Sequence, residues 1–130
     1  MTRTVYVNGK YLPENEATVS IFDRGFLFAD GVYEVTSVLD GKLIDFDGHA
    51  RRLAGSLGEL GMRNPIATED LLEVHRELVR ANGIVEGLIY LQITPRHSQF
   101  SQPLHEPTRL PLRNYRGSNI GEHPQENPTK

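Results

Sequence analysis

Arg52 is the residue of this sequence whose type and position are best suited to chemistry. It follows His49 by three residues, so the two side chains share one face of a predicted helix. A guanidinium offers planar, paired N–H donors that match a phosphate. On this pattern alone, a solvated arginine and a structural histidine are the commoner outcomes. Arg51 points elsewhere on the helix and is expected at the surface.

Tyr33 and Val35 are the second pair of interest. They lie two residues apart in a stretch rich in β-branched residues, which predicts a strand over residues 32–39. Alternate side chains share a face, so Tyr33 and Val35 should line one surface, with Glu34 and Thr36 facing away. On the pattern alone, an ordinary core tyrosine is the commoner outcome.

Architectural roles are predicted for the polar and glycine residues just before this strand. Asp23 or Asp30 can accept hydrogen bonds from the amides of its own loop. The glycines allow a positive φ or a close approach of the backbone. The residues of this group are Asp23, Arg24, Gly25, Asp30 and Gly31.

Composition excludes several classes of protein. The net charge is −3 with acids and bases interspersed, and there is no cysteine, which argues against a nucleic-acid footprint, a disulfide framework and thiolate metal sites. No apolar run approaches a membrane span of about 18 residues. The N-terminus alternates and has no signal-peptide block, so a cytoplasmic protein is expected. No metal site is expected, because His97, His105 and His123 lack ligand spacing.

Turn and helix signals predict an α+β domain with a mainly antiparallel sheet and two helices. Asn8-Gly9 and Asp40-Gly41 each predict a hairpin, the second leading into a strand over residues 42–46. The first helix is expected to begin at an Asp47 cap and end at Gly61, and the second to begin at a Thr68 cap and end at Asn82-Gly83. The second helix would carry His75 on its flank. A last strand is expected over residues 88–94.

Two unequal parts follow from composition. Residues 1–94 resemble a folded domain, whereas residues 95–130 hold six of the eight prolines. This tail cannot bury enough apolar surface to offset its ordering entropy. It is expected to be disordered or to be translated out of frame.

The segment from Asp23 to Glu34 resembles the D-R-G-x-x-x-x-D-G-V-Y-E segment of class IV (fold-type IV) aminotransferases, which use pyridoxal 5'-phosphate. His49-Ala50-Arg51-Arg52-Leu53 resembles the H-x-x-R-L motif of the same family. Ala29 stands where the family often has glycine. The resemblance covers about residues 3–94 and implies the fold of the family's N-terminal domain.

The resemblance also implies roles for these residues. Arg52 would grip the cofactor phosphate. Tyr33 would face cofactor and substrate, with Val35 lining the same pocket, and His49 would orient Arg52 or bond the backbone. Gly31-Val32-Tyr33-Glu34-Val35 is most similar to D-amino acid transaminases, which move an amino group from a D-amino acid such as alanine to a 2-oxo acid. Such enzymes are homodimers.

The family's cofactor-binding lysine has no counterpart here. Transamination needs a lysine that bonds the cofactor and moves a proton. In the family that lysine and the acid opposite the pyridine nitrogen lie well beyond residue 130. Lys10 and Lys42 fall at or beside hairpin turns, and Lys130 matches no motif. We therefore expect no catalytic residue in this chain and no activity from it alone.

The resemblance stops at Thr94. The family continues with Thr-Arg-Gly, whereas this chain has Thr94-Pro95-Arg96. One hypothesis is a single-nucleotide insertion, because deleting one C from suitable codons restores Thr-Arg-Gly. The other takes Arg96-His97 as a displaced remnant of an Arg-x-His pair that holds substrate carboxylate.

Several functions stay open at this point. Within the family, the alternatives are a branched-chain amino acid transaminase and an aminodeoxychorismate lyase. Outside catalysis, the chain could be a binding or dimerisation module built on the N-terminal domain. Composition alone also allows a small α+β domain of other ancestry.

Overall fold

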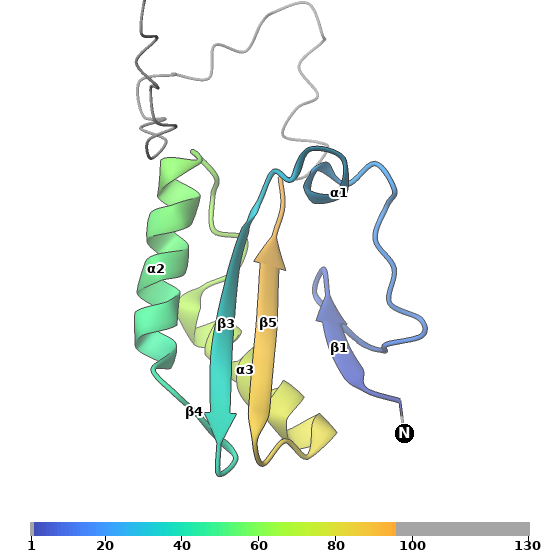
Figure 1. Ribbon diagram of the computed structural model, residues 1–130, viewed down its shortest axis with the longest axis vertical. Helices are drawn as coiled ribbons and strands as arrows, with labels where there is room; N and C mark the ends of the chain where they lie inside the picture. The colour runs from blue at the N-terminus through green and yellow to red at the C-terminus, as the bar shows by residue number, and fades with distance from the viewer. Residues whose placement is uncertain (1, 96–130) are drawn as a thin grey trace, which may run out of the picture.

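A computed structural model describes residues 2–95 of the chain. The elements are β1 (Thr4–Val7), β2 (Lys10–Pro13), α1 (Arg24–Phe28), β3 (Val32–Leu39), β4 (Lys42–Leu43), α2 (Phe46–Glu59), α3 (Thr68–Asn82) and β5 (Gly87–Ile93) (Figure 1). Every strand pairing is antiparallel, which confirms the predicted α+β class. The tail prediction for residues 95–130 falls outside the described residues except for Pro95, which is buried.

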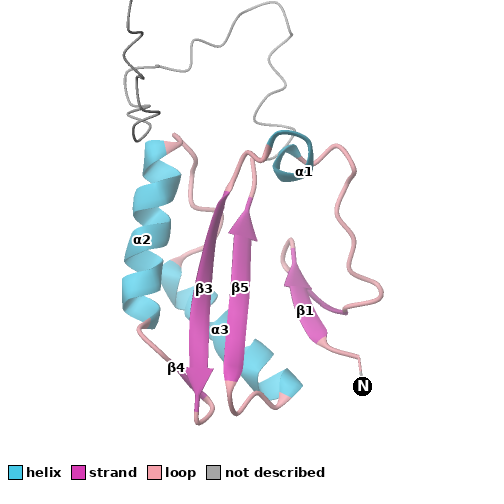
Figure 2. Cartoon of the chain, viewed as in Figure 1, coloured by secondary structure: helices cyan, strands magenta, loops and turns pink. Residues whose placement is uncertain are grey.

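The N-terminal hairpin forms where Asn8-Gly9 predicts it. Both turn residues have positive φ, 49° for Asn8 and 90° for Gly9, as a type I′ hairpin turn requires. Tyr6 and Tyr11 are opposite each other in the register, and their rings meet edge to face at 5.1 Å. This pair forms a sheet of its own, beside the main sheet (Figure 2).

The main sheet has the order β4-β3-β5. Strand β3 pairs with β5 from Val32 to Val38, but with β4 only at Val38 and Leu39. Among the residues that the structure describes, the edge of β3 from residue 32 to residue 36 therefore has no strand beside it. Helix α2 runs along this side of β3 (Figure 1).

Helices α2 and α3 cover one face of the main sheet, and the core lies between these helices and the sheet. The core is formed by the helix-facing Val32 of β3 together with side chains of both helices, namely Phe46, Leu53, Leu57 and Leu71. Thr36 of β3 and Ile89 of β5 point to the same side and are buried. The other face of the sheet carries the alternate residues and is open.

His75 corrects a sequence-based prediction. It is not on the flank of α3 but in its buried stripe, with only 3% of its surface exposed. Its Nδ1 lies 2.9 Å from the Leu71 carbonyl oxygen, and its ring meets Phe46 edge to face at 5.1 Å. The four-residue spacing from Leu71 puts His75 on the apolar face of the helix.

The caps of the two long helices also differ from prediction. Asp45, not Asp47, caps α2, because the buried Phe46 is already helical; its carboxylate accepts from the Gly48 amide at 3.2 Å. Helix α3 begins after Ala67, so Thr68 lies inside it and makes no cap bond. Strand β4 ends at Leu43, three residues short of the predicted end.

The helix ends match the predicted glycines. After α2, the Met62 amide donates to the Leu57 carbonyl at 2.8 Å and the Gly61 amide to the Gly58 carbonyl at 3.1 Å, which is the Schellman pattern. Gly61 has φ +65° and Gly83 has φ +58°, so both adopt the left-handed conformation that glycine accepts without strain.

Helix α1 is an element that the sequence did not predict. It has five residues, none of them buried, and lies beside the end of β5 and the start of β3 (Figure 1). Asp23 caps its first turn by accepting from the Gly25 amide at 2.8 Å. Because α1 buries no side chain, no hydrophobic periodicity marks it in the sequence.

Candidate functional site

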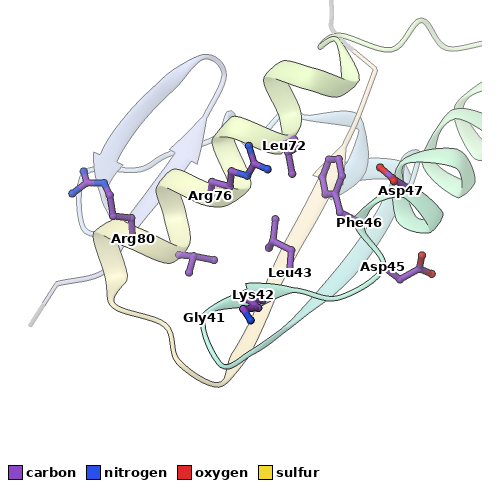
Figure 3. A pocket seen from close by; sticks show the side chains of 10 residues that line it. Gly41, Lys42, Leu43, Asp45, Phe46, Asp47, Leu72, Arg76 and Arg80 are labelled. Atoms are coloured by element: carbon purple, nitrogen blue, oxygen red, sulfur yellow. The ribbon is translucent and has the colours of Figure 1, made fainter.

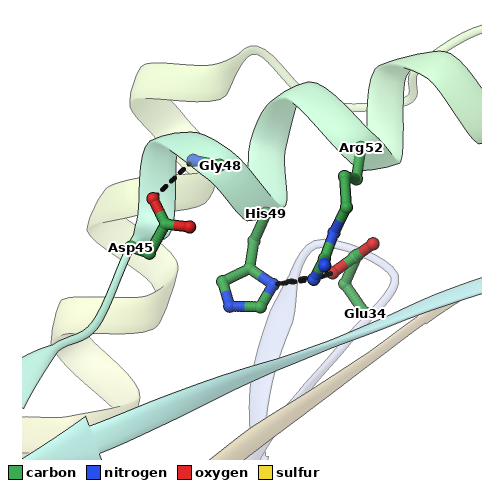
Figure 4. Close-up of polar contacts among 5 residues, drawn as sticks. All are labelled: Glu34, Asp45, Gly48, His49 and Arg52. Atoms are coloured by element: carbon green, nitrogen blue, oxygen red, sulfur yellow. Dashed lines mark hydrogen bonds and ion pairs between the residues drawn. The ribbon is translucent and has the colours of Figure 1, made fainter.

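Three side chains of the two sequence motifs meet between β3 and α2. The Glu34 Oε2 atom lies 2.7 Å from His49 Nδ1 and 2.8 Å from Arg52 Nη2 (Figure 4). His49 and Arg52 stand one turn apart on α2, so both reach the same carboxylate. We call Glu34, His49 and Arg52 the acidic anchor cluster.

The tautomer of His49 follows from its contacts with Glu34 and Arg52. Arg52 Nη2 and His49 Nδ1 are 2.8 Å apart, a contact that is a hydrogen bond only if Nδ1 lacks a proton. Without that proton, however, Nδ1 would face the Glu34 oxygen lone pair to lone pair. A carboxylate gains more from two charge-assisted donors, so His49 Nδ1 and Arg52 Nη2 both donate to Glu34.

Burial and charge act against each other at Glu34, whose side chain is only 11% exposed. Burial by itself would raise the pKa of this carboxyl. The hydrogen bonds from Arg52 and His49, with their charges, outweigh burial and hold the pKa of Glu34 below its ordinary value. The same bond to Glu34 raises the pKa of Arg52.

The Arg52 side chain is 65% exposed, unlike its partner. Among the described residues, its hydrogen bond to Glu34 and its close approach to His49 both involve Nη2. The donors on Nε and Nη1 are therefore available to an anion from outside the cluster. Arg51, the preceding residue, is exposed and takes part in neither contact of the cluster.

Tyr33 and Val35 share a face of β3, but it is the face opposite Glu34 and Arg52. Tyr33 is 66% exposed on the open side of the sheet, and its ring stacks on Tyr90 with a centroid distance of 5.9 Å. Val35 is half-buried and pairs with Tyr90 in the register of β3 with β5. The structure therefore does not bring these two residues into contact with Arg52.

The residues before β3 form a polar clasp on the end of β5. The Asp23 carboxylate accepts from the Gly25 amide at 2.8 Å and from the Thr94 hydroxyl at 2.9 Å. Arg24 Nε donates to Asp30 at 2.8 Å, and the Arg24 guanidinium lies 5.0 Å from the centroid of the Phe28 ring. This clasp joins residues 71 positions apart in the sequence.

Close approach, and not a positive φ, explains the two glycines of this segment. A Cβ on Gly31 would lie 2.8 Å from the Ile93 carbonyl oxygen and 3.1 Å from Thr94 Cγ2. A Cβ on Gly25 would lie 3.1 Å from Gln92 Nε2 and closer still to Thr94. The loop can therefore approach the end of β5 only because it has no side chain at these positions.

An open hollow among the described residues lies elsewhere. It is an open groove of about 670 Å³ between α3 and the segment from Gly41 to Asp47 (Figure 3). Both of its arginines are engaged, because Arg76 pairs with Glu73 at 2.7 Å and Arg80 with Glu77 at 2.6 Å. The groove contains none of the predicted site residues.

Residues 2–95 offer neither a metal site nor a membrane-spanning helix. No group of three or more His, Asp or Glu side chains is placed to hold a metal ion. No helix in this part of the chain has the length and apolar character needed to cross a membrane.

Glu34 is the site residue that sequence reasoning missed. The alternation of β3 correctly turned it away from Tyr33, but the side to which it turns is that of Arg52. An acid on the helix-facing side of a strand, in a protein whose next helix carries H-x-x-R, was the available signal. A nearly buried carboxylate requires a cationic partner.

Comparison with known proteins supports the resemblance. The sequence model of the family described as Amino-transferase class IV matches residues 31–114. A D-alanine aminotransferase of Staphylococcus haemolyticus is 40% identical over an alignment of 103 residues that covers 76% of this chain and 36% of the relative.

Solved structures agree with this match. The branched-chain aminotransferase of the archaeon Thermoproteus uzoniensis, solved with norvaline, is similar with a TM-score of 0.65 and 25% identity, over 81% of this chain and 37% of that one. A putative 4-amino-4-deoxychorismate lyase of Legionella pneumophila is similar with a TM-score of 0.57 and 25% identity, over 62% of this chain and 30% of that one.

Proposed function

Because the chain belongs to the class IV aminotransferase family, we propose that it forms the part of a D-amino acid transaminase that holds the cofactor phosphate. The full-length family uses pyridoxal 5'-phosphate. The chain spans about a third of the length of the D-alanine aminotransferases that it matches, 36% for the first of them. The whole protein would move an amino group from a D-alanine-type donor to a 2-oxo acid.

The exposed guanidinium of Arg52, held through one nitrogen, carries this proposal. Glu34 and His49 engage only the Nη2 side, so a phosphate can take the donors of Nε and Nη1. These two donors lie on different edges of the guanidinium, so a paired fork to a phosphate would combine one of them with the second N–H of Nη2. The residues present thus fit the phosphate group of the cofactor.

Tyr33 and Val35 would contribute to the substrate side. They lie on the open face of β3, and the edge of β3 between the two faces is free of a strand among the described residues. A ligand that lies across this edge can place its phosphate at Arg52 and its other end near Tyr33. The Tyr33 hydroxyl would then bind a substrate carboxylate.

The chemistry of the reaction needs groups that residues 2–95 do not supply. Bound pyridoxal phosphate supplies the electron sink that makes transfer of an amino group possible. Lys10 in β2 and Lys42 in β4 both belong to hairpins and stand outside the acidic anchor cluster. We therefore assign this chain binding roles only, with Arg52 for the phosphate and Tyr33 and Val35 for the substrate. The proposal includes a homodimer and a cytoplasmic location for the whole protein.

Other functions within the family compete with this proposal. Similarity to the Thermoproteus structure favours a branched-chain amino acid transaminase, and similarity to the Legionella protein favours a lyase of the aminodeoxychorismate type. The 40% identity to D-alanine aminotransferases is higher than the 25% identity to either structure, so we prefer the D-amino acid. Outside catalysis, a binding or dimerisation module remains the second class.

Titration of the chain with pyridoxal phosphate, followed by phosphorus NMR, tests the role of Arg52. Arg52→Ala removes charge-assisted hydrogen bonds worth about 1.5–3 kcal/mol each, so cofactor affinity should fall by about tenfold or more. Arg52→Lys should recover only part of the affinity, because an ammonium cannot reproduce the paired donors.

Arg51→Ala is the matched control for this experiment, since it removes the same charge one residue away. It should leave cofactor affinity nearly unchanged. Equal losses for Arg51→Ala and Arg52→Ala, or no loss for Arg52→Ala, would contradict the cofactor role and favour the non-catalytic module.

A further inference from the structure

Glu34 links the two motifs of the chain. It comes from the first motif, on β3, and its partners His49 and Arg52 come from the second, on α2. All three heavy-atom distances within the cluster are 2.7 to 2.8 Å, so the position of each side chain restricts the other two. Within α2, His49 cannot hold Arg52 by itself, because its Nδ1 donates to the same Glu34 oxygen and offers no acceptor to Arg52.

The low exposure of Glu34 makes it the fixed member of the cluster. Its neighbours on the same face of β3, Val32 and Thr36, are buried, and the Glu34 side chain itself is 11% exposed. Arg52, at 65% exposure, would otherwise sample many rotamers in water. The buried carboxylate thus holds one end of a mobile side chain.

From this geometry we infer that Glu34 is a positioning residue for anion binding by Arg52. It holds Nη2, keeps the Nε and Nη1 donors turned outward, and fixes His49 with its proton on Nδ1. This inference rests on the proposed function, because the anion concerned is the cofactor phosphate. It adds Glu34 to the phosphate side of the site, for which the sequence predicted Arg52 as the ligand and His49 as a structural or orienting residue.

A role of Glu34 through its charge alone would change phosphate affinity in the opposite direction from a positioning role, so the two roles can be distinguished. A carboxylate beside a phosphate repels it, so its removal should tighten phosphate binding if Glu34 acts only through its charge. If Glu34 acts by positioning, its removal should weaken binding, because the anion must then restrict an arginine that is no longer held. The sign of the change separates the two.

The experiment uses the whole 130-residue chain and inorganic phosphate as the probe. Glu34→Gln should weaken phosphate binding by about threefold to tenfold, the equivalent of the rotamer freedom that Arg52 regains. Glu34→Asp keeps the charge and should recover part of the affinity. In the background of Arg52→Ala, Glu34→Gln should have no further effect on phosphate affinity.

Nitrogen NMR provides a readout independent of the anion. In the parent, Arg52 Nε–H should exchange slowly with water and His49 should carry its proton on Nδ1. Glu34→Gln should speed the exchange of Arg52 and abolish the preference of His49 for Nδ1. Glu14→Gln is the control, since Glu14 also bonds an arginine, Arg3 Nε at 2.7 Å, but at an exposed site.

Each outcome decides a different claim. Unchanged NMR signals of Arg52 and His49 in Glu34→Gln, or tighter phosphate binding by that variant, would overturn the positioning role. Phosphate binding that is independent of Arg52 would overturn the cofactor role instead. The positioning role would then be tested only by the NMR signals of Arg52 and His49. If Glu34→Gln fails to fold, Glu34→Asp takes its place, and Arg52 exchange as slow as in the parent would count against the inference.

Discussion

Acidification should destabilise the chain through His75 before it affects any carboxylate. His75 is 3% exposed and packs on Phe46, and its Nδ1 proton goes to the Leu71 carbonyl. Burial is the largest influence on this group and lowers the pKa of His75 below its ordinary value of 6.5, with His49 nearby acting in the same direction. The neutral imidazole is therefore the form that the fold accepts.

The sign of the effect follows from proton linkage. Above pH 6.5 His75 is neutral in both the folded and the unfolded chain, so its contribution is constant. Below pH 6.5 the unfolded chain takes up a proton that the folded chain resists, so the free energy of unfolding falls as the pH falls. One such group gives a slope of up to about 1.4 kcal/mol per pH unit. Protonation of carboxyls with a lowered pKa, such as Glu34, lowers the free energy of unfolding only below about their ordinary pKa of 4.5.

Urea unfolding between about pH 4.5 and pH 8 measures this slope. The control is His75→Leu, which cannot take up a proton and keeps an apolar side chain in the core. We expect the parent to lose stability below pH 6.5 more steeply than the variant, whatever their relative stabilities in alkaline buffer. Parallel curves for the two proteins would refute the reasoning, since they would mean that another group carries the pH dependence.

Two further changes test the parts that hold the site. Gly31→Ala should destabilise the chain by about 1–3 kcal/mol, because its Cβ would lie 2.8 Å from the Ile93 carbonyl oxygen. Gly55→Ala is its control, since nothing lies within 4 Å of that Cβ on α2, and it should stabilise by up to about 1 kcal/mol in urea unfolding. Asn82→Ala removes two bonds to the Thr4 backbone, at 2.8 and 2.9 Å, and should cost about 1–2 kcal/mol. Hydrogen exchange of the β1–β2 hairpin should speed up in that variant, and unchanged exchange would show that Asn82 does not hold it.

The sequence predicted those features whose cause is local. Asn8-Gly9 and Asp40-Gly41 each turn the chain because asparagine, aspartate and glycine tolerate positive φ, and both turns are present with φ values from 49° to 90°. Gly61 ends α2 for the same reason. The alternation along β3 correctly separated Tyr33 from Glu34. None of these features requires knowledge of a distant residue.

Features that depend on distant residues were missed. The bond of Glu34 to Arg52 joins residues 18 positions apart, and that of Asn82 to Thr4 joins residues 78 positions apart. His75 lay within a predicted apolar stripe, yet its polarity suggested a flank, because the Leu71 carbonyl that satisfies it is invisible in the pattern. Helix α1 has no buried residue, so its conformation comes from the clasp and not from periodicity.

Contacts with Thr94 attach the first motif to the end of β5. Asp23 accepts from the Thr94 hydroxyl at 2.9 Å, and both motif glycines lie where a side chain would meet Thr94. Since α1 buries nothing, these contacts are what define the path of the loop from Asp23 to Gly31. That loop leads directly into Val32, the buried first residue of β3, and so sets which way Tyr33 and Glu34 face. The loop therefore depends on β5 remaining intact up to Thr94.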